Sequence, residues 1–293
     1  MKKPGVTVMK MRRITIGILL FLALLRADAY GDILRVFFLN AGEGDAIYIE
    51  TPDRQRILID AGNLITGYRV TMSLKSRGVN TIDALIITHP HPDHMGGVFY
   101  VVQEFDVKSH YDNGQSLSVR CDGDLYRWYA DLFRRESYKA LSAGDVLHFG
   151  KVIIRILSPE RLGSNWNENS LVMKIIYGKI SFLLMGDATG KIENVLLNKS
   201  SFMNSLESDV LKVGHHGAGD ATSEEFLEVV SPEYAIVSVN KGNIRGYPSA
   251  EVLKRINDNG IRVFLTYRDA DIAFESDGKT LSVVSAIPEK KKR

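Results

Sequence analysis

Cysteine is nearly absent from this sequence, and basic residues are not in excess once the N-terminus is set aside. Cys121 is the single cysteine among 293 residues, so no disulfide can form within the chain. Nothing around Cys121 indicates a nucleophile or a metal ligand, and we expect a small packed side chain there. Residues 1–29 hold six basic residues and one acidic residue, which leaves 31 basic against 34 acidic residues in the remainder. This balance gives no support to tight, non-specific binding of nucleic acid, which depends on lysine and arginine neutralising phosphates.

The N-terminal region lacks an apolar run long enough to span a bilayer comfortably. Its run Ile14–Leu25 falls short of the roughly 20 apolar residues that a spanning helix needs. Basic residues precede this run and Ala27-Asp28-Ala29 follows it, which together predict a secretory signal peptide over residues 1–29. We therefore expect an exported protein, periplasmic or extracellular, whose mature chain begins at Tyr30. The alternative is an uncleaved N-terminal anchor, because Arg26 lies beside the cleavage site.

The composition is that of a soluble globular protein. A hydrophobic content of 45% and a charged content of 25% provide enough apolar material for a sizeable core. We expect one domain over residues 30–286, followed by a basic, solvated tail at 287–293. Hydrophobic patterns predict strands at 33–39, 46–50, 56–62, 84–88, 138–141, 146–149, 152–157, 170–177, 179–185 and 210–213, and helices at 68–77, 125–136, 189–197 and 249–259. No part of the chain resembles a membrane domain beyond the signal peptide.

A dense cluster of histidines follows the predicted strand at 84–88. Two prolines break the chain there, so His89 and His91 are expected on a loop and Asp93 and His94 where a helix begins. Imidazole and carboxylate groups are both good ligands for zinc-class cations. The alternative, a polar surface loop that happens to carry histidines, does not account for so many ligand-type residues in one turn. The stretch therefore predicts a metal site.

Further acidic and imidazole side chains follow other predicted strands. Asp187 comes at the end of the strand at 179–185, and His215 and His216 follow the strand at 210–213. Strand, ligand-bearing loop, helix and strand thus occur twice, and we expect the two halves to pack as related layers. Asp60 ends the strand at 56–62, either as a turn former or as a carboxylate that orients metal-bound imidazole. Asp45 lies in a glycine-containing turn, where a simple loop role is the alternative to a site role.

Taken together, these motifs resemble the metallo-β-lactamase superfamily and, within it, the hydrolase domain of ComEC-like competence proteins, which handle DNA at the cell surface. The residues that carry the resemblance are Asp45, Asp60, His89, His91, Asp93, His94, Asn169, Ser170, Asp187, His215 and His216. The resemblance covers most of residues 33–285. It implies the α/β (α+β) class and a four-layer αββα sandwich with a dinuclear site at one edge of the sheets.

The same resemblance implies a ligand set for two divalent ions, zinc or manganese. His89, His91 and Asp187 would hold one ion, and Asp93, His94 and Asp187 would hold the other. Either His215 or His216, with His216 preferred, would complete the second site, and the other would face the substrate.

Two positions depart from the family pattern. Asn169 and Ser170 occupy the region where the wider superfamily has a further histidine ligand. This predicts either weaker metal binding at the first site or a better fit there for a hard, oxygen-tolerant ion such as manganese than for zinc. Gly246-Tyr247-Pro248 stands where the ComEC-like branch usually has Gly-His-Pro, and a phenol does not replace a neutral imidazole.

We predict an exported metal-dependent hydrolase whose substrate is a phosphodiester, with DNA as one candidate. Asp93 and His215 are the expected catalytic residues: Asp93 orients the attacking water or accepts its proton, and His215 steadies the departing oxygen. Asp45, Asp60, Asn169, Ser170 and Tyr247 are expected to support the ligands or contact the substrate. Two alternatives stay open: hydrolysis of a carboxylic ester, lactone or lactam on the same site, and a metal-binding protein without turnover, which Tyr247 favours. Protein partners are not predicted.

Overall fold

The computed structural model describes residues 32–116, 123–135, 137–199 and 206–284. The predicted signal peptide, Cys121 and the predicted basic tail lie outside these residues. Within them, no helix combines the length and the apolar character that crossing a membrane requires.

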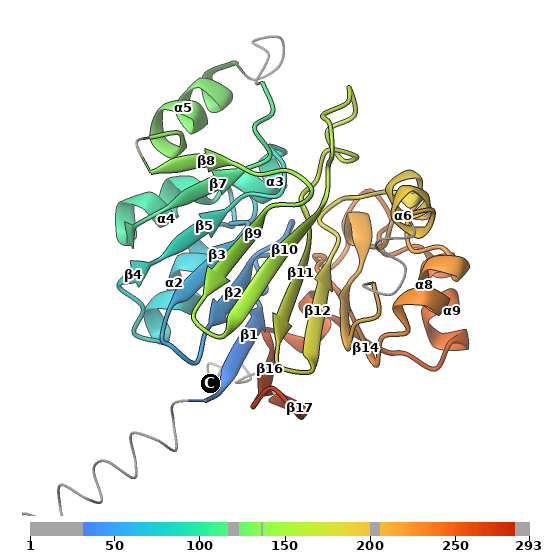
Figure 1. Ribbon diagram of the computed structural model, residues 1–293. Helices are drawn as coiled ribbons and strands as arrows, with labels where there is room; N and C mark the ends of the chain where they lie inside the picture. Colours follow the sequence, from blue (N-terminus) through green and yellow to red (C-terminus); the bar gives the residue numbers. More distant parts are fainter. Residues whose placement is uncertain (1–31, 117–122, 136, 200–205, 285–293) are drawn as a thin grey trace, which may run out of the picture.

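Two mixed β-sheets form the centre of the molecule (Figure 1). The first sheet contains, in spatial order, β17 (Leu281–Val284), β16 (Ile272–Ser276), β1 (Leu34–Phe38), β2 (Ile47–Glu50), β3 (Arg56–Ile59), β5 (Ala84–Ile86), β7 (His110–Asp112) and β8 (Tyr138–Ala140). The second contains β15 (Arg262–Leu265), β14 (Tyr234–Val237), β13 (Val210–Lys212), β12 (Ile180–Leu184), β11 (Val172–Tyr177), β10 (Val152–Ser158) and β9 (Val146–Phe149). A separate pair is formed by β4 (Thr81–Ile82) and β6 (Asp106–Val107).

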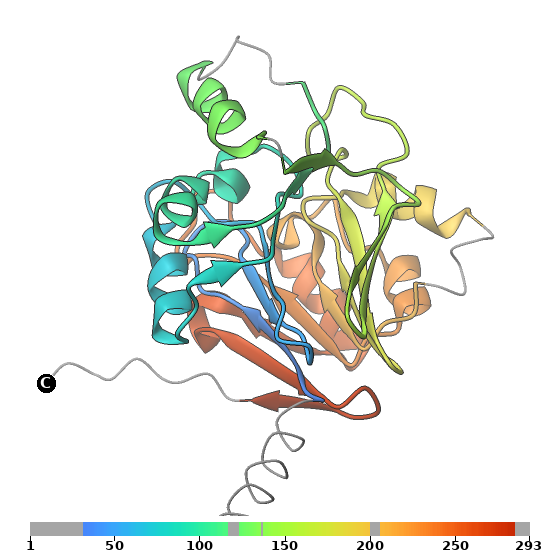
Figure 2. The same cartoon turned by 60° about the vertical axis from the view of Figure 1, so that its left-hand side comes forward.

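Helices cover the outer face of each sheet (Figures 1 and 2). Those beside the first sheet are α2 (Tyr68–Ser76), α4 (Val98–Glu104) and α5 (Gly123–Phe133). Those beside the second are α6 (Gly190–Leu197), α8 (Glu224–Val230) and α9 (Ala250–Asp258). The short helices α3 (Pro92–Met95) and α10 (Thr266–Asp269) and the 3₁₀ turn η1 (Gly214–Gly217) follow strands.

Alternating side chains along the strands produce the layers. In β1, Val36 and Phe38 belong to the core between the sheets, whereas Phe37 packs against the helix-covered core of the first sheet. In β12, Phe182 lies in the core between the sheets and Leu183 lies in the core shared with the outer helices. A period of two with apolar residues on both faces requires cover on both faces. The αββα sandwich implied by the resemblance is confirmed.

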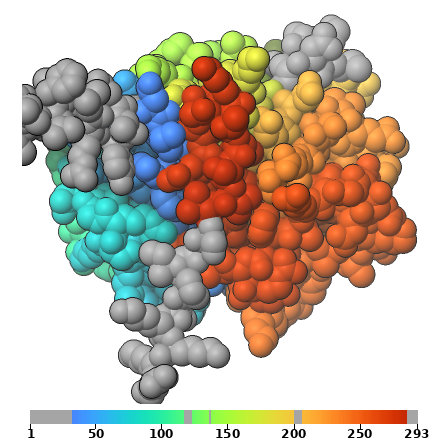
Figure 3. Space-filling model, turned by 90° about the horizontal axis from the view of Figure 1, so that it is seen from below, coloured from blue at the N-terminus to red at the C-terminus, as the bar shows by residue number. Residues whose placement is uncertain are grey.

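The C-terminal strands return to the first sheet rather than extending the second. β16 pairs with β1 in antiparallel register, Val36 opposite Phe274, and β17 continues beyond β16. Figure 3 shows this red hairpin beside the blue N-terminal strand. The expected division into two sequential halves is therefore incomplete, because the last strands belong to the half that begins the chain.

Several element boundaries differ from the sequence-based expectation. The strand expected at 56–62 ends at Ile59, because Asp60 has a left-handed backbone with φ 58°. The strand expected from residue 170 begins at Val172, because the Ser170 amide donates to the Asn167 carbonyl in a turn. The helix expected at 125–136 spans Gly123–Phe133. The two corrected strand ends lie beside the candidate site, where the backbone turns to present side chains.

Candidate metal centre

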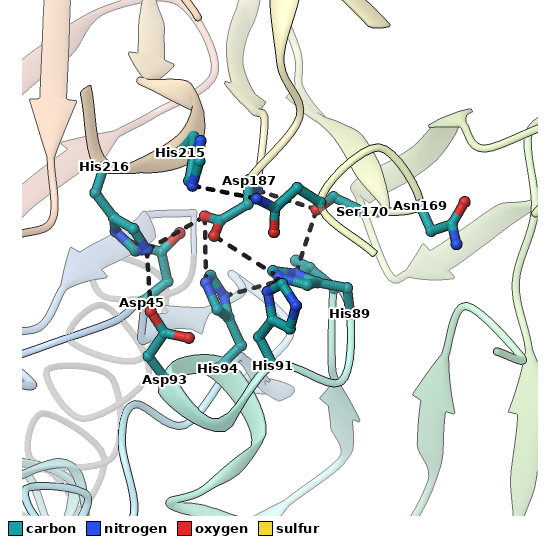
Figure 4. A network of polar contacts seen from close by, with 12 residues as sticks. Asp45, His89, His91, Asp93, His94, Asn169, Ser170, Asp187, His215 and His216 are labelled. Atoms are coloured by element: carbon teal, nitrogen blue, oxygen red, sulfur yellow. Dashed lines mark hydrogen bonds and ion pairs between the residues drawn. The ribbon is translucent and has the colours of Figure 1, made fainter. Parts of the chain in front are cut away.

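The predicted ligands lie at one edge of the sandwich. Strands β1, β3 and β5 run in one direction, and β12 and β13 are parallel to each other. The histidine motif follows β5, Asp187 follows β12, and His215 and His216 follow β13. The carboxyl ends of parallel strands meet at the same edge, where ligands bind in sheets of this kind. Side chains from both sheets therefore converge at one point (Figure 4).

Proline and glycine shape the loops that carry these ligands. Pro92 occupies the first position of α3, where its missing N–H leaves no helical hydrogen bond unmade. A Cβ atom at Gly97 would lie 1.8 Å from the carbonyl oxygen of Ala61, and one at Gly44 would lie 1.6 Å from that of Asp93. Glycine at these two positions therefore lets the ligand loops pack directly on neighbouring backbone.

Four buried side chains form what we call the four-ligand group: Asp93, His94, Asp187 and His216. The Nε2 atoms of His94 and His216 lie 3.2 and 3.3 Å from Asp187 Oδ1. His216 Nε2 is also 3.6 Å from Asp93 Oδ2. Two imidazoles and two carboxylates thus face a common centre.

His89, His91 and Asp187 form a second cluster, the three-ligand group. His89 Nε2 lies 3.0 Å from His91 Nδ1 and 3.7 Å from Asp187 Oδ2. The two carboxylate oxygens of Asp187 therefore face different groups. Asp187 is therefore a candidate ligand in both groups.

Buried polar atoms without hydrogen-bond partners make the four-ligand group a candidate cation site. Asp93 Oδ2, His94 Nε2, Asp187 Oδ1 and His216 Nε2 are buried without a hydrogen-bond partner among the described residues. Buried polar atoms are rarely left in this state, because desolvation without a partner is costly. Imidazole nitrogen and carboxylate oxygen are the donors that divalent transition metals prefer. The side chains present fit divalent metal binding.

Comparison with known proteins agrees with this geometry. The family model described as "Metallo-beta-lactamase superfamily" matches residues 39–239. This chain belongs to the metallo-beta-lactamase superfamily. The chain is 29% identical over 257 residues to ComE operon protein 3 of Bacillus subtilis and 28% identical over 229 residues to competence protein ComA of Neisseria gonorrhoeae. These alignments cover 82% and 78% of this chain but only 32% and 30% of the relatives, so the chain spans about a third of their length.

Two further similarities bear on the fold and on part of the sequence. A segment of 68 residues, 22% of this chain and 24% of the relative, is 32% identical to exodeoxyribonuclease WalJ of Streptococcus pneumoniae. Among solved structures, the metallo-beta-lactamase fold protein YhfI of Bacillus subtilis aligns with a TM-score of 0.55 at 12% identity, covering 84% of this chain and 100% of that one. The second similarity shows a shared fold.

In this metallo-beta-lactamase superfamily member, the buried Asp60 carboxylate holds the histidine loop through hydrogen bonds to Thr88 and a contact with His94. Asp60 Oδ1 accepts a hydrogen bond from the Thr88 amide (2.7 Å), and Oδ2 accepts one from the Thr88 hydroxyl (2.9 Å). Asp60 Oδ2 also lies 2.8 Å from His94 Nδ1, which leaves His94 Nε2 facing the four-ligand group. Carboxylates behind metal-binding imidazoles fix the ring and its tautomer in this way.

His216 is supported by a second set of buried groups. Its Nδ1 lies 2.9 Å from the Ser238 carbonyl oxygen and 3.6 Å from Asp45 Oδ1. The ammonium group of Lys212, fully buried, lies 3.0 Å from Asp45 Oδ2 and donates to the Val213 carbonyl. Asp45 is thus held by a buried lysine behind the ligand.

His215 and Tyr247 line an open cavity of about 230 Å³ above the ligands. His215 Nε2 lies 3.2 Å from Asn167 Nδ2, and the edge of its ring meets Tyr247 with centroids 5.4 Å apart. The Arg245 guanidinium enters the same cavity, 3.6 Å from Asp93 Oδ2, and is half exposed. The structure therefore places His216 among the ligands and His215 at the cavity wall.

Of the two predicted neighbours Asn169 and Ser170, only Ser170 contacts the ligands. The Ser170 hydroxyl accepts a hydrogen bond from the Asp187 amide (3.0 Å) and lies 3.2 Å from His89 Nδ1, so it braces both ligands. The Asn169 amide donates to Gln115 and Gly163 instead. Figure 4 shows Asn169 apart from the cluster. The structure does not bring the Asn169 side chain to the ligands.

Charges within the site follow from burial and from the neighbours of each group. Burial lowers the pKa of His89 and of His91. Burial would also lower the pKa of His94 and His216, but Asp187 and other carboxylates raise the former well above its usual value and the latter to about 10. Burial opposes ionisation of Asp187, yet His216 and His94 hold its pKa well below normal. In the metal-free protein, protons on two imidazoles therefore balance the carboxylates.

Sequence reasoning missed Arg245, Asn167, Lys212 and Thr88. Lys212 carries the one available signal, because a lysine inside an apolar strand that runs into a histidine pair requires a buried partner. Arg245 and Asn167 come from loops whose positions depend on the fold. Neither has a recognisable spacing to the histidine motif.

Proposed function

We propose that this protein is a metal-dependent phosphodiesterase acting on nucleic acid, with two divalent ions, zinc or manganese, at the ligand groups. The observation that carries the proposal is the shared Asp187 beneath a cavity into which Arg245 points. Two adjacent cations suit in-line displacement at phosphorus, and arginine recognises phosphate oxygens. One partial relative supports this class of substrate, since it is named an exodeoxyribonuclease.

When bound, the ions supply Lewis acidity to phosphoryl oxygens and lower the pKa of a water molecule. The protein side chains perform the remaining steps. Asp93, whose Oδ2 lies in the cavity 3.6 Å from the Arg245 guanidinium, orients the attacking water or accepts its proton. Arg245 contacts a non-bridging phosphate oxygen, and His215, which lines the same cavity, steadies the departing oxygen.

Asn167 and Asp220 hold His215 in this role. Asn167 contacts Nε2, and Asp220 Oδ1 lies 3.2 Å from Nδ1. A carboxylate beside Nδ1 helps to fix the orientation of the ring. Tyr247 packs on the ring edge and fixes its orientation.

The test is hydrolysis of a substrate panel by protein loaded with zinc or with manganese. The panel contains a bis-aryl phosphate, a single-stranded oligonucleotide, a lactone and a β-lactam. We expect turnover of the two phosphodiesters and a loss of about 100-fold or more in Asp93→Asn and His215→Ala. Asp106→Asn, which alters an exposed carboxylate paired with Lys108, is the control. Turnover of the lactone or lactam alone would contradict the proposed substrate class. No turnover of any substrate in the panel would contradict the proposal that the protein is an enzyme.

We also propose that the chain is exported through residues 1–29. The support is the basic region, the short apolar run and the Ala27-Asp28-Ala29 site. Intact-mass analysis of material from outside the cytoplasm should show a chain that begins at Tyr30. A mass that includes Arg26 and the apolar run would replace this proposal with a membrane-anchored protein.

A further inference from the structure

A second, larger cavity lies along the same edge of the sandwich as the metal centre. It measures about 770 Å³ and lies between α2 and α10, with Asn40 and Asp271 between the two helices. Asn40 follows β1, α2 follows β3, and α10 follows β15. Because these strand ends meet at the edge that carries the ligands, the cavity and the metal centre share one rim of the molecule.

Two stretches of chain connect this groove to the metal centre. The loop 40–45 places Asn40 in the groove, Glu43 and Gly44 in a small hollow beside Asp93, and Asp45 behind His216. On the other side, the Thr266 hydroxyl bonds the Val239 backbone, and Val239 lines the same hollow as Arg245. Tyr267 and Arg268, next in sequence, line the groove. The groove is therefore anchored to the walls of the metal site.

The groove exposes aromatic and flexible apolar surface. Tyr68 on α2 is 44% exposed, and Tyr267 on α10 is 39% exposed. Met72, one turn further along α2 from Tyr68, is 63% exposed. Two aromatic rings and a thioether facing one cavity form a surface on which planar groups can stack.

Positive charge exceeds negative charge in the groove. Asp271 is paired with Arg77 (3.0 Å), and Arg268 is paired with Asp269 (2.8 Å). Arg69 also lines the groove, is exposed, and has no acidic partner among the described residues. The unmatched charge is therefore a guanidinium beside the exposed tyrosines.

We propose that this groove binds the single-stranded flank of a nucleic-acid substrate whose scissile phosphate lies at the metal centre, an inference that rests on the proposed function. Tyr68 and Tyr267 stack on unpaired bases, and Arg69 contacts a backbone phosphate. Aromatic stacking with local cationic contacts is how proteins hold single strands without reading sequence. These contacts would also supply affinity for nucleic acid that the net acidic charge of residues 30–293 does not.

A double-stranded flank does not suit this surface. Bases in a duplex are already stacked on one another and do not present their faces to Tyr68 or Tyr267. One unmatched arginine is also too little for duplex binding, which relies on many phosphate contacts. The groove therefore predicts a preference for a strand that extends beyond the cleaved bond.

Binding is measured with metal-loaded protein and a fluorescent phosphorothioate oligothymidylate of about 20 nucleotides, longer than one single-strand site. Tyr267→Ala should weaken binding about tenfold, whereas Tyr267→Phe, which keeps the ring, should stay within about twofold of the wild type. Arg69→Ala should weaken binding. It should also make the slope of log K against log salt concentration shallower by less than one, as expected for the loss of one phosphate contact. Arg155→Ala, an exposed arginine on β10 in the second sheet, is the matched control.

Turnover separates the groove from the chemistry. Tyr267→Ala should raise KM for the natural-backbone oligonucleotide about tenfold and leave kcat/KM for a bis-aryl phosphate unchanged. Equal losses on both substrates would indicate a structural role and overturn the groove proposal. So would wild-type protein that fails to bind the oligonucleotide, or binding that Tyr267→Ala does not change. If the protein binds the oligonucleotide through Tyr267 but turns over neither substrate, the proposed function is wrong and the groove is still supported as a binding site.

Discussion

The two ligand groups share Asp187 but differ in what lies behind their imidazoles. In the four-ligand group, His94 is backed by the Asp60 carboxylate, and His216 is backed by a carbonyl with Asp45 and Lys212 beyond it. In the three-ligand group, His89 is braced by the hydroxyls of Thr88 and Ser170. His91 stacks on Trp166, with ring centroids 5.5 Å apart.

This difference predicts unequal metal affinities. Buried carboxylates behind a ligand raise its basicity and fix its orientation more strongly than hydroxyls or a stacked ring do. The four-ligand group also provides one more side chain and has every member buried, whereas His91 is partly exposed. We expect the four-ligand group to hold the tighter ion and the three-ligand group the weaker one.

The largest effect should come from Asp187→Asn, because the shared carboxylate belongs to both groups. Neither ion should be retained, and hydrolysis of a bis-aryl phosphate should fall about 10³-fold or more. Metal content by mass spectrometry and kcat/KM measure these losses. Asp106→Asn provides a matched control on the surface. Two ions retained by Asp187→Asn would show that the carboxylate is not shared.

His216→Ala and His91→Ala should separate the groups. The first change should weaken the tighter ion by roughly 100-fold or more, and the second should weaken the other ion and leave the tighter one in place. Isothermal titration of metal-free protein resolves the two binding events. If the two variants give the same titration curves, the prediction that the two ligand groups differ in metal affinity is wrong.

Asp60→Asn should affect the four-ligand group more than the three-ligand group, because Asp60 contacts His94 directly and His89 only through the Thr88 hydroxyl. Replacing the carboxylate behind His94 should lower affinity for the tighter ion by about 10- to 100-fold, as found for groups that support metal-bound imidazole. The fold should persist, because the amide still accepts a hydrogen bond from Thr88. A change confined to the weaker ion would contradict the geometry.

The smallest expected effect is in pH dependence. The pKa of His216 is raised to about 10 in the metal-free protein, so a cation must displace its proton at neutral pH. Affinity for the tighter ion should therefore rise between pH 7 and pH 10, by at most about tenfold per pH unit for each proton released. The pKa values of His89 and His91 are lowered, so both rings are already neutral at pH 7 and the weaker ion should show little dependence. Proton release on titration with metal tests both statements.

The ligand loops could be predicted from sequence because a strand end fixes where a polar side chain goes. His89, Asp187 and His216 each follow an apolar strand, and parallel strands deliver such residues to one edge. Sequence did not separate Asn169 from Ser170, because adjacent residues point in different directions at a turn. It also missed Arg245, since a loop residue acquires its role only when the second sheet packs against the first.

The sequence predicted the layers of the fold but not the connectivity of its last strands. Alternating apolar residues in β1 and β12 require cover on both faces, which fixes the layers. Nothing local indicates that β16 pairs with β1, because the antiparallel edge of the first sheet accepts any strand of suitable pattern.

That pairing governs when the molecule can take up metal. Arg35 and Glu275, bonded across β1 and β16, are 240 positions apart, and the Asn40 amide at the head of the loop that carries Asp45 is held by Asp271. During synthesis these late residues must leave the ribosome before the first sheet can close and Asp45 can take its place. The complete centre therefore forms only after translation has passed β16.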